Sequence, residues 1–172
     1  MLNSPFFDFN FAGPRRRVVQ VAARVGRVLP FAALRQKAPL PYMESIHAAH
    51  HGEWSFDLEW RPLNGFPIYL GWLRAIVQAH QRVRRGLAIT CPVLLMHSDK
   101  SVYGSHWHPG FQTGDGVLNV AHIRAGSQYL GSNVQVVEIR DGMHDLVLSG
   151  LAVRGQVFAE LFGWLASLRP AA

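Results

Sequence analysis

The chain has 172 residues, of which 49% are hydrophobic and 16% are charged, and its formal net charge is +6. This length and composition are typical of one globular domain with a real core, so we expect no disulfide or metal to be needed for folding. No stretch of about 18 uncharged apolar residues is present, and we therefore expect no transmembrane segment.

The amino terminus and the cysteine content bear on the cellular compartment. Residues 1–5 lack the basic start and apolar middle of a secretion signal. Cys91 is the only cysteine, so the chain cannot form an internal disulfide. Both observations predict a cytoplasmic protein.

Basic residues outnumber acidic ones by 17 to 11, and all of the basic side chains except Lys37 and Lys100 are arginines. Such a balance can attract an anionic partner. The arginines are spread along the chain, however, and no nucleic-acid-binding motif accompanies them. We therefore expect no nucleic-acid partner and keep a basic nucleic-acid-binding domain only as a weaker alternative.

Before residue 90 the pattern is helical and irregular. Pro14 stands where a helix can start, and apolar residues then recur at helical spacing until Pro30. Residues 38–66 are rich in proline, glycine and aromatic side chains, which is typical of short helical turns and loops. A second helix is predicted over residues 67–85, where Gly86 ends it.

After residue 90 strands and helices alternate. The apolar run at residues 91–97 predicts a strand, and a long polar loop then leads to a helix over residues 119–130. A second strand is predicted over residues 134–140 and a final helix over residues 151–168. This β-α-β-α order predicts an α/β fold with a parallel sheet covered by helices on both sides. Two strands cannot form that sheet alone.

Candidate catalytic residues follow both predicted strands. Asp99 and Asp115 lie in the loop after the first strand, and His144 follows the second. In parallel sheets the functional loops lie past the carboxyl ends of the strands. A catalytic histidine needs an acid that fixes its tautomer and stabilises its charged form. The order of these residues therefore predicts an acid–histidine pair.

At these residues the chain resembles the α/β-hydrolase family. Pro92-Val93-Leu94-Leu95-Met96-His97 and Gly142-Met143-His144-Asp145, in this order and separation, resemble cap-bearing esterases of the monoacylglycerol lipase, lysophospholipase and serine aminopeptidase-like type. The resemblance implies the end of a core strand and the approach to a cap over residues 1–9, a helical cap over 10–66, and the closing α-β-α-β-α part of the core over 67–172. It also implies hydrolysis of an acylglycerol-like or lysophospholipid-like ester by a serine nucleophile.

The nucleophile motif of that family is absent. No serine is flanked by glycine two residues away on both sides, as the Gly-x-Ser-x-Gly elbow requires. We therefore interpret the chain as the carboxyl-terminal half of a hydrolase, inactive alone on its small-molecule ester or lipid-like substrate. The alternative is a non-catalytic binding or oligomerisation module derived from the scaffold, in which an exposed strand edge favours self-association or pairing with a companion half.

Two aspartates compete for the role of the acid. Asp99 is close to the first strand but is followed by Lys100 and Ser101. Asp115 is followed by a glycine, two apolar residues and a helix, as the acid of the resembled family usually is. We prefer Asp115 as the partner of His144, with Asp99 as the alternative.

Nine histidines raise the question of a metal site, but their spacing matches no established zinc signature, so we predict no metal and no cofactor. Aromatic residues in the first half are compatible both with an acyl pocket and with an ordinary cap core. They are Phe6, Phe7, Phe9, Phe11, Trp54, Phe56, Trp60, Phe66, Tyr69 and Trp72.

Overall fold

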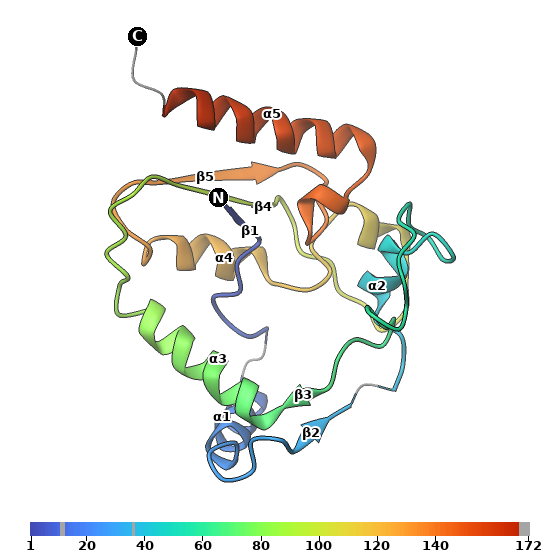
Figure 1. Ribbon diagram of the computed structural model, residues 1–172, viewed down its shortest axis with the longest axis vertical. Coiled ribbons are helices and arrows are strands. Elements are labelled where there is room, and N and C mark those ends of the chain that lie inside the picture. The colour runs from blue at the N-terminus through green and yellow to red at the C-terminus, as the bar shows by residue number, and fades with distance from the viewer. Residues whose placement is uncertain (11–12, 36, 169–172) are drawn as a thin grey trace.

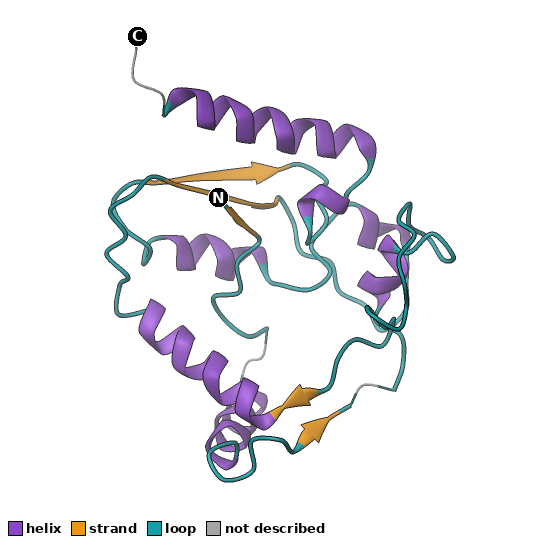
Figure 2. Cartoon of the chain, in the orientation of Figure 1, coloured by secondary structure: helices purple, strands orange, loops and turns teal. Residues whose placement is uncertain are grey.

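A three-stranded parallel sheet forms the centre of the molecule. The computed structural model describes residues 1–10, 13–35 and 37–168. The strands are β1 (Leu2–Asn3), β4 (Val93–Ser98) and β5 (Val134–Ile139), in the order β1-β4-β5. Leu2 pairs with Leu95, and the β4–β5 register runs from Val93–Val134 to Ser98–Ile139. Figures 1 and 2 show the sheet between two layers of helix, so the predicted α/β fold is confirmed.

Strand β4 is the core of the sheet, and all six of its residues are buried. Because alternate side chains of a strand point to opposite faces, its apolar residues divide between two clusters. Leu95 packs with Ile123 of α4 (Val120–Ser127) on one face. Leu94 and Met96 pack with Val157 of α5 (Leu151–Ser167) on the other. This double burial explains why the first four residues of the strand, 93–96, are all apolar.

A smaller layer lies at the opposite end of the molecule from α5 (Figure 1). Helix α1 (Pro14–Val25) packs against α3 (Leu70–Val83), and β2 (Ala33–Leu34) pairs with β3 (Ile68–Tyr69) in antiparallel orientation. A Cβ atom at Gly26 would overlap the backbone carbonyl of Leu70, so only glycine permits this approach of the chain after α1 to α3.

The segment around helix α2 packs against the loop that follows β5. Helix α2 (Pro41–Ile46) buries Tyr42, Met43 and Ile46 against Met143. The indole N–H of Trp54 donates a hydrogen bond to the carbonyl oxygen of Leu148, at 2.9 Å. Two short 3₁₀ turns, Pro109–Gln112 and Leu146–Leu148, complete the secondary structure of the described residues.

Several predicted boundaries differ from the observed ones. The helix predicted over residues 67–85 begins only at Leu70, because Ile68 and Tyr69 pair with β2 instead. The first helix ends at Val25 rather than near Pro30. Within the described ranges no helix is long and apolar enough to cross a membrane. The division into core and cap at residues 10 and 66 remains a prediction.

Candidate active site

The loop after β4 returns to the end of its own strand before α4 begins. The backbone N–H of Asp115 donates to the carbonyl oxygen of Lys100 at 2.9 Å, and the N–H of Val102 donates to the carbonyl oxygen of Asp115 at 2.8 Å. Ser101 and Asp115 consequently form an isolated parallel bridge. The enlarged loop therefore carries Asp115 to the carboxyl edge of the sheet despite its distance from β4 in the sequence.

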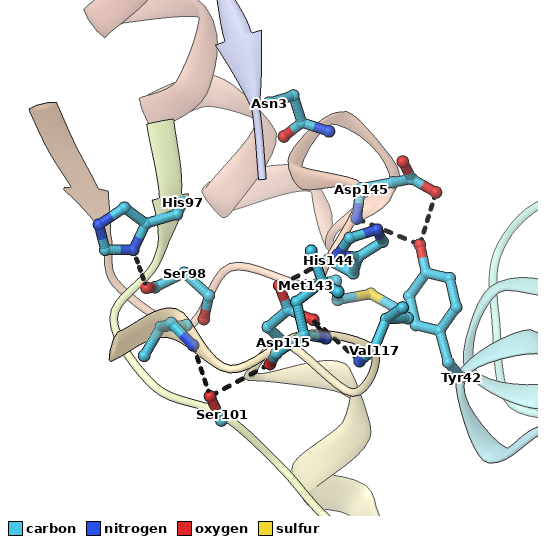
Figure 3. A network of polar contacts seen from close by, with 12 residues as sticks. Asn3, Tyr42, His97, Ser98, Ser101, Asp115, Val117, Met143, His144 and Asp145 are labelled. Atoms are coloured by element: carbon cyan, nitrogen blue, oxygen red, sulfur yellow. Dashed lines mark hydrogen bonds and ion pairs between the residues drawn. The ribbon is translucent and has the colours of Figure 1, made fainter. Parts of the chain in front are cut away.

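Asp115 and His144 meet at this edge, with their side chains directed toward each other (Figure 3). The distance between Oδ2 of Asp115 and Nδ1 of His144 is 3.0 Å. The other carboxylate oxygen accepts hydrogen bonds from the backbone N–H groups of Val117 and Leu118, at 2.8 and 2.7 Å. Asp115 is 0% exposed, so these partners satisfy a carboxylate that is removed from water.

Asp99 has different partners. Its Oδ1 accepts a hydrogen bond from the backbone N–H of Asp141 at 3.0 Å, which joins the end of β4 to the turn after β5. Asp141 has a φ of +56°, a conformation that a non-glycine residue rarely adopts. Asp99 makes no hydrogen bond to His144 within the described part of the chain. Of the two aspartates, Asp115 is the one within hydrogen-bond distance of His144.

A second polar group supports the loop that carries His144. The hydroxyl of Tyr42 donates to Oδ2 of Asp145 at 2.7 Å and accepts from the N–H of Asp145 at 3.2 Å. Arg61 pairs with the same carboxylate at 3.0 Å. Burial raises the pKa of the Tyr42 phenol, and the charge of Asp145 raises it further, so the hydroxyl remains a donor. The Tyr42 ring meets His144 edge-on at 5.7 Å between centroids.

A cavity of about 430 Å³ lies beside the imidazole. Its lining comes from the segment after β1, the start of α3, the acid loop and the histidine loop. The lining residues are Ser4, Phe6, Phe9, Asn10, Trp72, Val117, Leu118 and His144. The side chain of Asn10 donates to the carbonyl oxygen of Val117 and accepts from the N–H of Asn119, which fixes the first of these segments to the acid loop.

The predicted aromatic residues divide between pocket and core. Phe6, Phe9 and Trp72 line the cavity. Trp54 and Phe56 instead pack around α2. Phe11 lies outside the described residues.

Ser4 is a residue of this site that sequence patterns do not reveal. It follows β1, is only 4% exposed and has a φ of +41°. The residue lines the cavity, and its hydroxyl is buried without a hydrogen-bond partner in the described structure. The following Pro5 disfavours helical conformations at position 4, but it does not predict a positive φ. None of the ten serines, all of which the structure describes, donates a hydrogen bond to His144.

The described ranges contain no group of three histidine, cysteine, aspartate or glutamate side chains placed to hold a metal ion. The histidines of the α2 region have other contacts instead. His51 stacks on Trp107 with 3.4 Å between ring centroids, and His47 accepts a hydrogen bond from the N–H of Ala49.

No family model matches the sequence, and no curated protein sequence matches it. Solved structures are similar to this chain in fold. The monoacylglycerol lipase of Paleococcus ferrophilus superposes with a TM-score of 0.64 at 16% identity, over 96% of this chain and 57% of the lipase. The fold is that of part of an α/β-hydrolase.

A second solved structure agrees with the first. A soluble variant of monoglyceride lipase from Saccharomyces cerevisiae, in complex with a substrate analog, has a TM-score of 0.56 at 11% identity. That similarity covers 96% of this chain and 54% of the lipase. This α/β-hydrolase-fold chain therefore spans little more than half the length of either lipase.

Proposed function

We propose that this chain supplies the acid, the histidine base and part of the acyl pocket of a carboxylic-ester hydrolase. The observation that carries the proposal is the 3.0 Å contact between Asp115 and His144 past the ends of two adjacent parallel strands. A buried acid that engages Nδ1 fixes the tautomer in which Nε2 is free to accept a proton. The similarity to lipases supports the same chemistry, with the serine nucleophile outside these 172 residues.

The chemistry follows from that tautomer. Nε2 of His144 takes the proton of a serine hydroxyl as its oxygen attacks the ester carbonyl, and Asp115 stabilises the resulting imidazolium. The same proton then passes from Nε2 to the oxygen of the leaving alcohol as the carbon–oxygen bond breaks. Water repeats the sequence and releases the carboxylic acid from the acyl-serine.

The lining of the cavity supports an acyl substrate. Most of its surface is apolar and comes from Phe6, Phe9, Trp72, Val117 and Leu118. The cavity volume lies within the range of small-ligand sites, in which a few polar groups orient an otherwise apolar ligand. An acylglycerol or a lysophospholipid has this chemistry, with an alkyl chain at one end and a polar alcohol at the other.

The absence of a serine elbow supports inactivity of the isolated chain. Without a nucleophile no acyl-enzyme forms, although an activated ester can still react slowly with an imidazole. Treatment with a fluorophosphonate probe tests this point, and we expect no labelled serine by mass spectrometry. Labelling of one serine, with Ser4 as the first candidate because of its place in the cavity, would place the nucleophile inside the chain.

Binding can be tested without turnover. We expect a glycerol monoalkyl ether, which cannot be hydrolysed, to shift the amide NMR signals of His144, Leu118 and Trp72. Val117→Trp places a large ring in the cavity from a partly exposed position and should abolish these shifts. Val136→Trp, at a similarly exposed site on β5, is the matched control. Shifts that spread over the chain, or that survive Val117→Trp, would contradict an acyl pocket here.

One observation favours the second candidate function, an association module. Among the described residues, strand β1 has a hydrogen-bonded neighbour on one side only, and α5 exposes an apolar row on its outer side. The row consists of Leu151, Phe158, Phe162 and Leu165. A companion half that adds a strand beside β1 and a helix beside α5 would cover both. Size-exclusion chromatography with light scattering tests this: a monodisperse monomer unaffected by Phe162→Ser contradicts it.

A further inference from the structure

The layer formed by α1, β2, β3 and α3 has an unusual charge. Residues 13–35 and 66–90 contain ten arginines and no aspartate or glutamate. Only Arg16 and Arg84 have an acidic partner in the described structure, and both pair with Asp8. The other eight arginines of the layer have no acidic partner among the described residues.

The same layer exposes large apolar side chains. Phe31 is 86% exposed, and Val28, Leu34, Tyr69 and Trp72 are also exposed. Three of them, Phe31, Tyr69 and Trp72, line a hollow of about 760 Å³ together with Pro30, Ala33, Arg35 and Gly71. We call the surface formed by Phe31, Arg35, Tyr69 and Trp72 the arginine–aromatic face. It lies at the end of the molecule farthest from α5 (Figure 1).

We propose that the arginine–aromatic face docks on an anionic lipid bilayer. Apolar and aromatic side chains among arginines suit the boundary between headgroups and acyl chains, where rings enter the apolar region and guanidinium groups bind phosphates. Residues 13–35 and 66–90 contribute no carboxylate, which matches a partner surface of negative charge, to which each arginine adds attraction. A duplex nucleic acid would use the arginines but not the exposed ring of Phe31.

The face is continuous with the candidate site. Trp72 lines both the hollow of the arginine–aromatic face and the cavity beside His144. Docking therefore places one wall of the cavity at the lipid surface, from which an acyl chain can enter. This consequence rests on the proposed function, whereas the docking itself does not.

Co-sedimentation with lipid vesicles tests the docking. We expect the full chain to bind vesicles of phosphatidylcholine and phosphatidylserine, to bind phosphatidylcholine alone more weakly, and to lose affinity as salt rises. Arg35→Gln should weaken binding to the anionic vesicles about fivefold, and Phe31→Ser about tenfold. Both side chains are exposed, so neither change should alter the fold.

Matched controls come from the opposite end of the molecule. Leu168→Ser removes a side chain just after α5 that is 42% exposed, and Arg140→Gln removes an exposed cation after β5. Neither should change vesicle binding. The proposal is overturned by the absence of vesicle binding, by an equal effect of the controls, or by tight salt-dependent binding to duplex DNA without a preference for anionic vesicles. The ether-binding NMR experiment reports on the proposed function separately, because it contains no membrane.

Discussion

Asp115 contacts Nδ1 of His144 through one carboxylate oxygen, while its other oxygen accepts the N–H groups of Val117 and Leu118. Backbone groups of its own loop therefore fix the orientation of the Asp115 carboxylate that contacts His144. Because both oxygens are occupied, the carboxylate cannot rotate without losing several hydrogen bonds, and the imidazole receives a fixed partner.

Asp115→Asn should lower the free energy of unfolding by about 1–3 kcal/mol, because the amide presents a donor to a buried N–H. Urea denaturation measures this loss. Asp99→Asn is the control, since the side chain of Asp99 is partly exposed and can still accept the N–H of Asp141. We expect less than about 1 kcal/mol for that variant. A larger loss for Asp99→Asn than for Asp115→Asn would contradict the assigned network.

Ser4→Ala should leave stability unchanged or raise it by up to about 1 kcal/mol, because it removes a buried hydroxyl that has no partner. Ser149→Ala is the matched comparison. The hydroxyl of Ser149 is fully buried and accepts the N–H of Met143 at 2.9 Å, so its loss should cost about 1–3 kcal/mol. Thermal and urea unfolding of both variants provide the test, and a marked loss for Ser4→Ala would contradict the description of its hydroxyl.

Gly126→Ala should destabilise the fold by about 1–3 kcal/mol. A Cβ atom at this position of α4 would overlap the ring of Phe7, which is packed in the core. Gly155→Ala in α5 meets no atom within 4 Å and should stabilise the chain by about 0.5–1 kcal/mol through helix propensity. Denaturant midpoints for the two variants should therefore move in opposite directions; movement in the same direction would contradict the packing of α4.

His80 predicts a pH dependence of stability. Burial lowers its pKa, although the hydrogen bond to the carbonyl oxygen of Phe6 and the charge of Asp8 act in the opposite direction. As the pH falls through about 6.5, His80 therefore binds a proton in the unfolded chain before it does so in the folded chain. The contribution of His80 to the free energy of unfolding is fully present above about pH 6.5 and declines as the pH falls below that value.

His80→Gln can keep a donor for the Phe6 carbonyl oxygen without adding a charge. Urea denaturation across this pH range should then show a shallower decline than the unsubstituted chain. An unchanged slope would assign the pH dependence to other groups.

Much of the fold follows from local sequence patterns. The first four residues of β4 are apolar because both faces of the strand are buried, and this pattern identifies a central parallel strand. The boundaries of α3 were less predictable, because the pairing of Ile68 with Leu34 joins residues far apart in the sequence.

The candidate site was predictable only in part. The type and order of Asp115 and His144 indicate the pair, but its geometry depends on how a long loop folds back on β4. The bond between Tyr42 and Asp145 and the strained backbone of Ser4 depend on packing between distant segments, for which no short motif exists.

The hydrogen-bonded Nδ1 proton of His144 gives the most direct test of the central pair. NMR of ¹⁵N-histidine-labelled protein should contain a downfield Nδ1–H signal that is assigned by its loss in His144→Gln. We predict that Asp115→Asn removes this signal and that Asp99→Asn retains it. Its retention in Asp115→Asn, or its loss in Asp99→Asn, would contradict the assignment of Asp115 as the acid that orients His144.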